Sequence, residues 1–148
     1  MNYSMKRSSV YKETSIRTSS PTRLVVMLYQ GAIRFLRQAV NEIEVNDFMA
    51  KGQSVDRAVA IIQHLQSTLD MKGGQAISQE LDRLYTYSLT RIFAGSAKLD
   101  RKPIEEAIQL LTTLLSAWEE IAMEELEHAI PPGLLANHAV TGRLELHA

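Results

Sequence analysis

The chain has 148 residues, of which 45% are hydrophobic, and this suits one compact domain built around a single core. Its net charge of -1 gives no overall basic field that would hold nucleic acid, so we expect no nucleic-acid partner. The absence of cysteine excludes disulfides, cysteine-based zinc sites and thiol catalysis.

Residues 1–19 are basic and rich in Ser and Thr, and they lack sustained hydrophobic periodicity. We expect a flexible, solvated arm there. No apolar segment of the signal-peptide type follows the early positive charges. The longest early apolar run, Leu24 to Tyr29, is far shorter than the roughly 18 residues of a membrane span. These features predict a cytoplasmic protein that does not insert into a membrane.

The first helix is predicted to begin at Ser20-Pro21, because Ser is a favoured N-cap and proline suits the first helical position. It extends to about Asn46, which makes a rod of about 40 Å. Its apolar residues sweep about 260° around the axis, so the edge formed by three side chains is left over after a normal core face is assigned. These are Val26, Ile33 and Val40. Either a partner, the arm or the acidic tail covers this edge, or the helix lies centrally in the bundle.

Three further helical patterns follow, and each has an apolar arc of roughly 160–180°, which is normal for a helix packed in a bundle. They cover about residues 48–69, 77–99 and 103–122. Short connections imply antiparallel neighbours, and no stretch alternates at the period of a strand. The sequence therefore predicts an all-α fold, an antiparallel up-and-down four-helix bundle over residues 20–122. The arm 1–19 precedes it, and a tail over 123–148, partly helical or disordered, follows it.

The sequence gives little support to a catalytic, cofactor or metal site. A di-metal carboxylate centre in a four-helix bundle needs two Glu-x-x-His pairs and two further glutamates. The chain offers one such pair, Glu125 with His128, beyond the regular part of the last helix. We therefore predict a protein that is no enzyme, has no catalytic, cofactor-binding or metal-ligating residues, and acts by binding another protein. A di-metal bundle enzyme is the rival from another class.

An ordered set of residue groups runs along the chain. The groups are Tyr11 with Ile16, Ser20-Pro21, Met27-Leu28-Tyr29-Gln30-Gly31-Ala32, Leu65 with Leu69-Asp70, Gly73-Gly74, Leu81 with Leu84-Tyr85-Thr86-Tyr87, and Leu115-Ser116-Ala117-Trp118. This set resembles the signature of the FliS family, the flagellar export chaperones for flagellin. The resemblance covers roughly residues 10–122, and it departs at Gln30, where the family usually has Asp.

The resemblance implies a cytosolic chaperone that binds the disordered C-terminal segment of flagellin in hydrophobic grooves. It implies that the chaperone prevents premature polymerisation and delivers flagellin to the flagellar type III export apparatus. In the family, the chaperone's own N-terminal segment can occupy one groove when the client is absent. Tyr11 and Ile16 match that segment. The predicted partner-binding residues are Tyr11, Ile16, Val26, Tyr29, Ile33 and Val40.

Two alternatives stay open at the level of the sequence. The same apolar face suits a helical regulatory protein that sequesters another flagellar factor or a transcription factor. A weak homodimer through an exposed apolar edge is also compatible with the pattern. The tail over residues 123–148 lies outside the resemblance, so the sequence assigns it no role.

Overall fold

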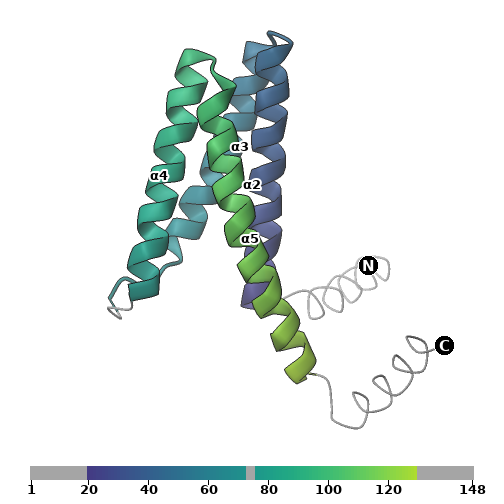
Figure 1. Ribbon diagram of the computed structural model, residues 1–148, viewed down its shortest axis with the longest axis vertical. Helices are drawn as coiled ribbons and strands as arrows, with labels where there is room; N and C mark the ends of the chain where they lie inside the picture. Colours follow the sequence, from purple (N-terminus) through teal and green to yellow (C-terminus); the bar gives the residue numbers. More distant parts are fainter. Residues whose placement is uncertain (1–19, 73–75, 130–148) are drawn as a thin grey trace, which may run out of the picture.

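The computed structural model describes residues 20–72 and 76–129, which contain four helices and, within these ranges, no strand (Figure 1). The helices are α2 (Pro21–Glu44), α3 (Phe48–Ser67), α4 (Ala76–Lys98) and α5 (Arg101–Ala129). The predicted all-α fold is confirmed. The predictions for the arm, including Tyr11 and Ile16, and for residues 130–148 lie outside the described residues.

The four helices surround one core as an antiparallel up-and-down bundle. Helix α2 packs against α3 and α5, and α4 packs against the same two helices. The α2–α3 and α4–α5 turns lie at one end of the bundle, at the top of Figure 1. Helix α5 continues beyond Ala122 to Ala129, and its last turns project past the opposite end.

Local hydrogen bonds explain where the helices begin. The Ser20 side chain accepts a hydrogen bond from the backbone N–H of Arg23 at 3.0 Å, and Pro21 follows at the first helical position. This is the predicted N-cap arrangement. Asp47 caps α3 in the same way, with its carboxylate 3.2 Å from the backbone nitrogen of Ala50.

Both turns at the top end close by the same C-terminal motif. Asn46 and Leu99 have φ of 60° and 55°, and in each case the next residue donates to a carbonyl five positions earlier. The Asp100 N–H reaches the Gly95 carbonyl at 2.9 Å, which is the pattern of a Schellman motif. Asn tolerates this left-handed backbone, whereas it is unfavourable for Leu. Two tight turns therefore fix the top end.

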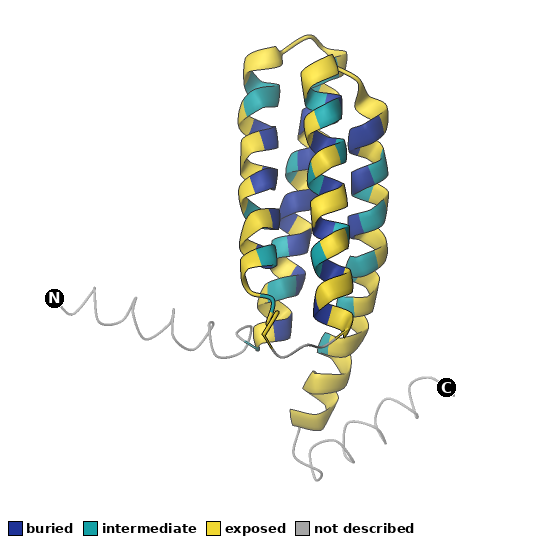
Figure 2. Cartoon of the chain, turned by 90° about the vertical axis from the view of Figure 1, so that its left-hand side faces the viewer, coloured by how far each residue is buried: buried dark blue, intermediate teal, exposed yellow. Residues whose placement is uncertain are grey.

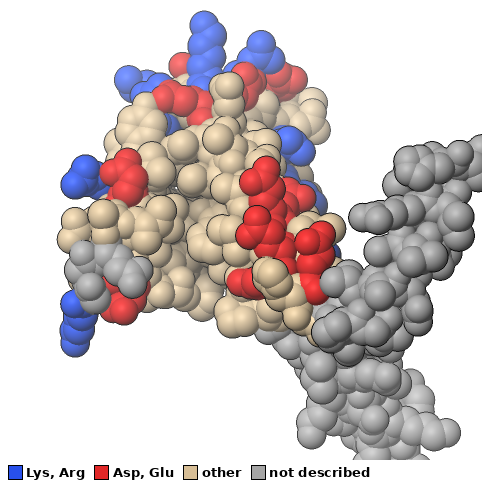
Figure 3. All heavy atoms as spheres, turned by 60° about the horizontal axis from the view of Figure 1, so that its bottom comes forward, with Lys and Arg blue, Asp and Glu red and all other residues tan. Residues whose placement is uncertain are grey.

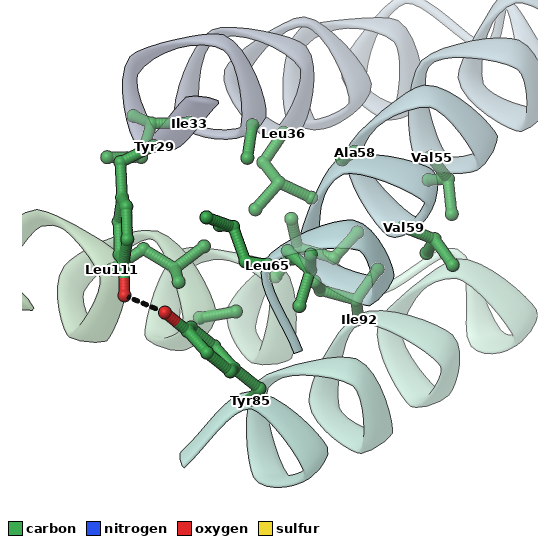
Figure 4. Close-up of a cluster of buried hydrophobic side chains, with 14 of the residues drawn as sticks. Tyr29, Ile33, Leu36, Val55, Ala58, Val59, Leu65, Tyr85, Ile92 and Leu111 are labelled. Atoms are coloured by element: carbon green, nitrogen blue, oxygen red, sulfur yellow. Dashed lines mark hydrogen bonds between the residues drawn. The ribbon is translucent and has the colours of Figure 1, made fainter. Parts of the chain in front are cut away.

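The core is apolar and runs along the whole bundle (Figure 2). Its largest fully buried apolar side chains come from all four helices: Tyr29, Leu36, Ile62, Tyr85, Ile92, Ile104 and Leu111. Figure 4 shows several of them meeting between the helices. Ser88 also lies in this core, and its hydroxyl has no hydrogen-bond partner among the described residues.

The structure decides between the alternatives left open for the Val26, Ile33 and Val40 edge of α2. Val26 and Ile33 are 0% and 4% exposed, and Val40 is half-buried, so this edge belongs to the core. The physical reason is that α2 packs against both α3 and α5, which requires two apolar faces on one helix. The central position of this helix, one of the alternatives from the sequence, accounts for its wide apolar arc. The exposed apolar side chains of α2 are instead Leu24 and Met27.

Candidate functional site

An apolar groove lies at the end of the bundle away from the two tight turns. We call it the end groove, and its volume is about 500 Å³. It forms where α2 and α4 begin, α3 ends and α5 passes by. Its lining residues are Pro21, Thr22, Leu24, Val25, Leu28, His64, Leu65, Thr68, Leu69, Asp70, Ile77, Ser78, Leu81, Tyr85 and Trp118.

The end groove exposes large apolar side chains to solvent. Leu24 of α2 and Ile77 of α4 are 48% and 63% exposed. Figure 3 shows this end of the molecule, where uncharged side chains fill the middle of the face and acidic side chains gather at one side. A contiguous apolar surface of this kind marks an interaction site.

Tyr85, which lines the end groove, is joined by a hydrogen bond to Tyr29, which is buried behind the groove wall. The hydroxyl oxygens of Tyr29 and Tyr85 are 2.6 Å apart, and the rings are tilted by 50° with centroids 6.2 Å apart (Figure 4). Burial raises the pKa of both phenols, and the hydrogen bond to Tyr85 raises the pKa of Tyr29 further. Both hydroxyls therefore keep their protons at neutral pH.

A second hollow, of about 550 Å³, lies along the contact between α2 and α5. The polar strip of α2 lines it with Gln30, Arg34, Arg37, Gln38 and Asn41, and α5 contributes Thr112 and Leu115. Ile33 is the apolar residue that α2 adds. This hollow is more polar than the end groove, so it is less suited to an apolar segment.

The predicted partner-binding residues within the described ranges lie mostly in the core. Val26, Tyr29 and Ile33 are buried, and Val40 is half-buried. None of them lines the end groove, although Tyr29 is hydrogen-bonded to Tyr85, which does line it. Their role in partner binding stays a prediction.

The sequence contained a signal for the end groove that the helical projection did not use. Several residue groups that carry the family resemblance come from three different helices and meet in this groove. They include Leu65 of α3, Leu69 just after α3, Leu81 and Tyr85 of α4, and Trp118 of α5. Leu24, Val25 and Leu28 of α2 complete the wall. A shared motif whose members are far apart along the chain points to such a meeting place.

The described residues give no structural support for a metal site. No group of three or more His, Cys, Asp or Glu side chains in these ranges is placed to hold an ion. Glu125, part of the single Glu-x-x-His pair, instead accepts a hydrogen bond from the Thr22 hydroxyl at 2.7 Å. Within the described ranges, none of the helices has the length and hydropathy needed to cross a membrane.

Comparison with known proteins gives a consistent result. The family described as flagellar protein FliS matches residues 3–125. The chain is 33% identical over 116 residues to the flagellar secretion chaperone FliS of Salmonella typhimurium, covering 78% of this chain and 86% of the relative. It is 32% identical to the flagellar secretion chaperone FliSB of Pseudomonas aeruginosa, covering 81% and 98%. For the Bacillus subtilis chaperone FliS the identity is 29%, with 79% and 86% covered.

Proposed function

The chain belongs to the FliS family of flagellar export chaperones, and we propose that it binds the disordered C-terminal segment of flagellin in the cytoplasm. In this proposal it prevents premature polymerisation and delivers flagellin to the flagellar type III export apparatus. FliS is a family of chaperones and not of enzymes. We extend that to this chain and assign it no catalysis.

The observation that carries the proposal is the end groove. Apolar side chains of an amphipathic client helix fit a groove of about 500 Å³ lined by Leu, Val, Ile and Trp side chains. Ordering a disordered client costs about 2–5 kcal/mol of the gross interaction energy. That cost keeps the complex reversible, as delivery to an export apparatus requires.

The place of the first turn of α2 supports a role for residues 1–19 in the same groove. Pro21 and Thr22, in the first turn of α2, line the end groove, so the arm is tethered at its rim. A tethered segment has a high effective concentration, on the order of millimolar for a short linker. We propose that Tyr11 and Ile16 compete with the client for the end groove. Deleting residues 1–18 is then expected to lower the dissociation constant for the client, and an unchanged constant removes the arm from the mechanism.

Calorimetric titration of the full chain with a C-terminal flagellin peptide tests the proposal, with an N-terminal flagellin fragment as the control ligand. Binding of the C-terminal peptide alone is expected. Equal binding of both fragments, or binding of neither, contradicts the proposal and favours the alternative of a regulatory protein with another client.

Two matched variants test whether the end groove is the binding surface. Ile77→Glu places a carboxylate at an exposed position of the groove. We expect it to raise the dissociation constant for the client by at least about tenfold, because the charge must lose its water when the client binds. Met49→Glu is the control, since Met49 is 79% exposed in the first turn of α3, at the other end of the bundle. If both variants lose the same amount of affinity for the client, the client binds outside the end groove.

A further inference from the structure

The hydrogen-bonded tyrosine pair has one proton more than it uses. Each phenol has a single proton, and one proton lies between the two oxygens, 2.6 Å apart. The other proton must point elsewhere. Tyr29 is 0% exposed and has no contact with the end groove, whereas Tyr85 forms part of its wall.

The surroundings determine which tyrosine donates to the other. If Tyr85 donated, the proton of Tyr29 would be left without an acceptor inside an apolar core, which folding strongly disfavours. Tyr29 is therefore the donor and Tyr85 the acceptor of the shared hydrogen bond.

The direction of the pKa changes agrees with this assignment. Their shared hydrogen bond raises the pKa of Tyr29, as expected for the donor, and lowers that of Tyr85, as expected for the acceptor. The hydroxyl proton of Tyr85 is thus unused. Among the described residues, the Tyr85 hydroxyl has Tyr29 as its one hydrogen-bond partner.

A second hydroxyl lies on the same wall. Ser78 lines the end groove two turns before Tyr85 on α4. Hydroxyls on one side of an otherwise apolar groove are suited to a ligand that brings oxygen atoms.

We propose that the Tyr85 hydroxyl donates a hydrogen bond to a backbone carbonyl oxygen of the polypeptide that fills the end groove. The inference rests on the proposed function, because the polypeptide is the flagellin segment. Client side chains that enter an apolar groove are themselves apolar, so the oxygen available there is that of the main chain. In a helix only the last four carbonyls are free. A client helix in the groove therefore ends beside Tyr85, or the client is extended there.

Two conservative variants separate the proposed bond from the shared one. Tyr29→Phe and Tyr85→Phe both remove the hydrogen bond between the phenols and keep both rings, but only the second removes the donor to the client. We expect Tyr85→Phe to raise the calorimetric dissociation constant about five- to tenfold, and Tyr29→Phe to change it less than about twofold. Circular dichroism of the free chains confirms that both are folded.

Replacing single amides of the peptide by esters identifies the carbonyl, because an ester carbonyl is a weaker acceptor. At one position, the ester is expected to weaken binding of the peptide to the wild type but not to the Tyr85→Phe variant. Such coupling is the signature of two groups in direct contact. If Tyr85→Phe does not fold, proton NMR of the wild type replaces it. Adding the peptide is then expected to slow solvent exchange of the Tyr85 hydroxyl proton.

The outcomes distinguish this inference from the proposed function. A wild-type chain that does not bind the peptide overturns the proposed function. A wild-type chain that binds, with equal constants for the two Phe variants, overturns the Tyr85 bond alone. So does the lack of any ester position coupled to Tyr85, or an unchanged exchange rate of its hydroxyl proton.

Discussion

The same substitution at two glycines is predicted to have opposite effects on folding. A Cβ atom at Gly95 would lie 2.6 Å from the Asp100 carbonyl oxygen and 2.8 Å from Cγ1 of Ile104. The first contact is with backbone held by the Schellman motif, so it does not relax easily. Overpacking costs about 1–3 kcal/mol, and Ala in place of Gly in a helix returns about 0.5–1 kcal/mol. Gly95→Ala is therefore expected to lower the free energy of unfolding by about 1–2 kcal/mol.

Gly52→Ala provides the control for this prediction. Gly52 lies inside α3, and a Cβ atom there meets nothing within 4 Å. Only the gain in helix propensity remains, so the free energy of unfolding should rise by about 0.5–1 kcal/mol. Urea denaturation followed by circular dichroism measures both changes. If Gly95→Ala stabilised the chain as Gly52→Ala does, the close approach of the α4–α5 turn would be refuted.

Further predictions concern single side chains. Ser88→Ala should raise the free energy of unfolding by about 1 kcal/mol, because it removes a buried hydroxyl without a partner. Thr22→Val should lower the free energy of unfolding by about 1 kcal/mol, because the hydrogen bond to Glu125 is lost. Urea denaturation measures the change in both variants. The Tyr87 hydroxyl lowers the pKa of Glu106, so this contribution to stability is present above the unfolded-state pKa and is lost as the pH falls through the folded-state value. Tyr87→Phe should raise the Glu106 pKa in an NMR titration, and an unchanged value would contradict the contact. A weak homodimer stays a prediction, which sedimentation analysis checks.

The helices and the core were largely predictable, because they depend on local pattern. Ser20-Pro21 marks the start of α2, and the apolar spacing places Ile62, Ile92 and Leu111 inward. The end of α5 was less predictable. Its last turns are rich in glutamate and mostly exposed, so they lack the apolar face that marks a packed helix.

The groove could not be predicted from one helix at a time. The wide arc of α2 reflects two packed faces on one helix, and it did not indicate which apolar side chains remain exposed. That depends on how α5 packs against α2, and packing buries Val26 and Ile33 while leaving Leu24 outside. Likewise, Trp118 and Ile77 come together only through the fold. Positions set by contacts between distant segments require the tertiary structure.

The two ends of the bundle differ in how the chain connects them. At the top, two tight turns tie α2 to α3 and α4 to α5. At the groove end, the chain joins only α3 to α4, and the Thr22–Glu125 hydrogen bond links α2 to α5. Local opening between α2 and α5 at that end stretches no connecting segment. Amide protons in the first turns of α2 should therefore exchange faster than those near its C-terminal end, and the groove can widen for a client while the rest of the bundle stays folded.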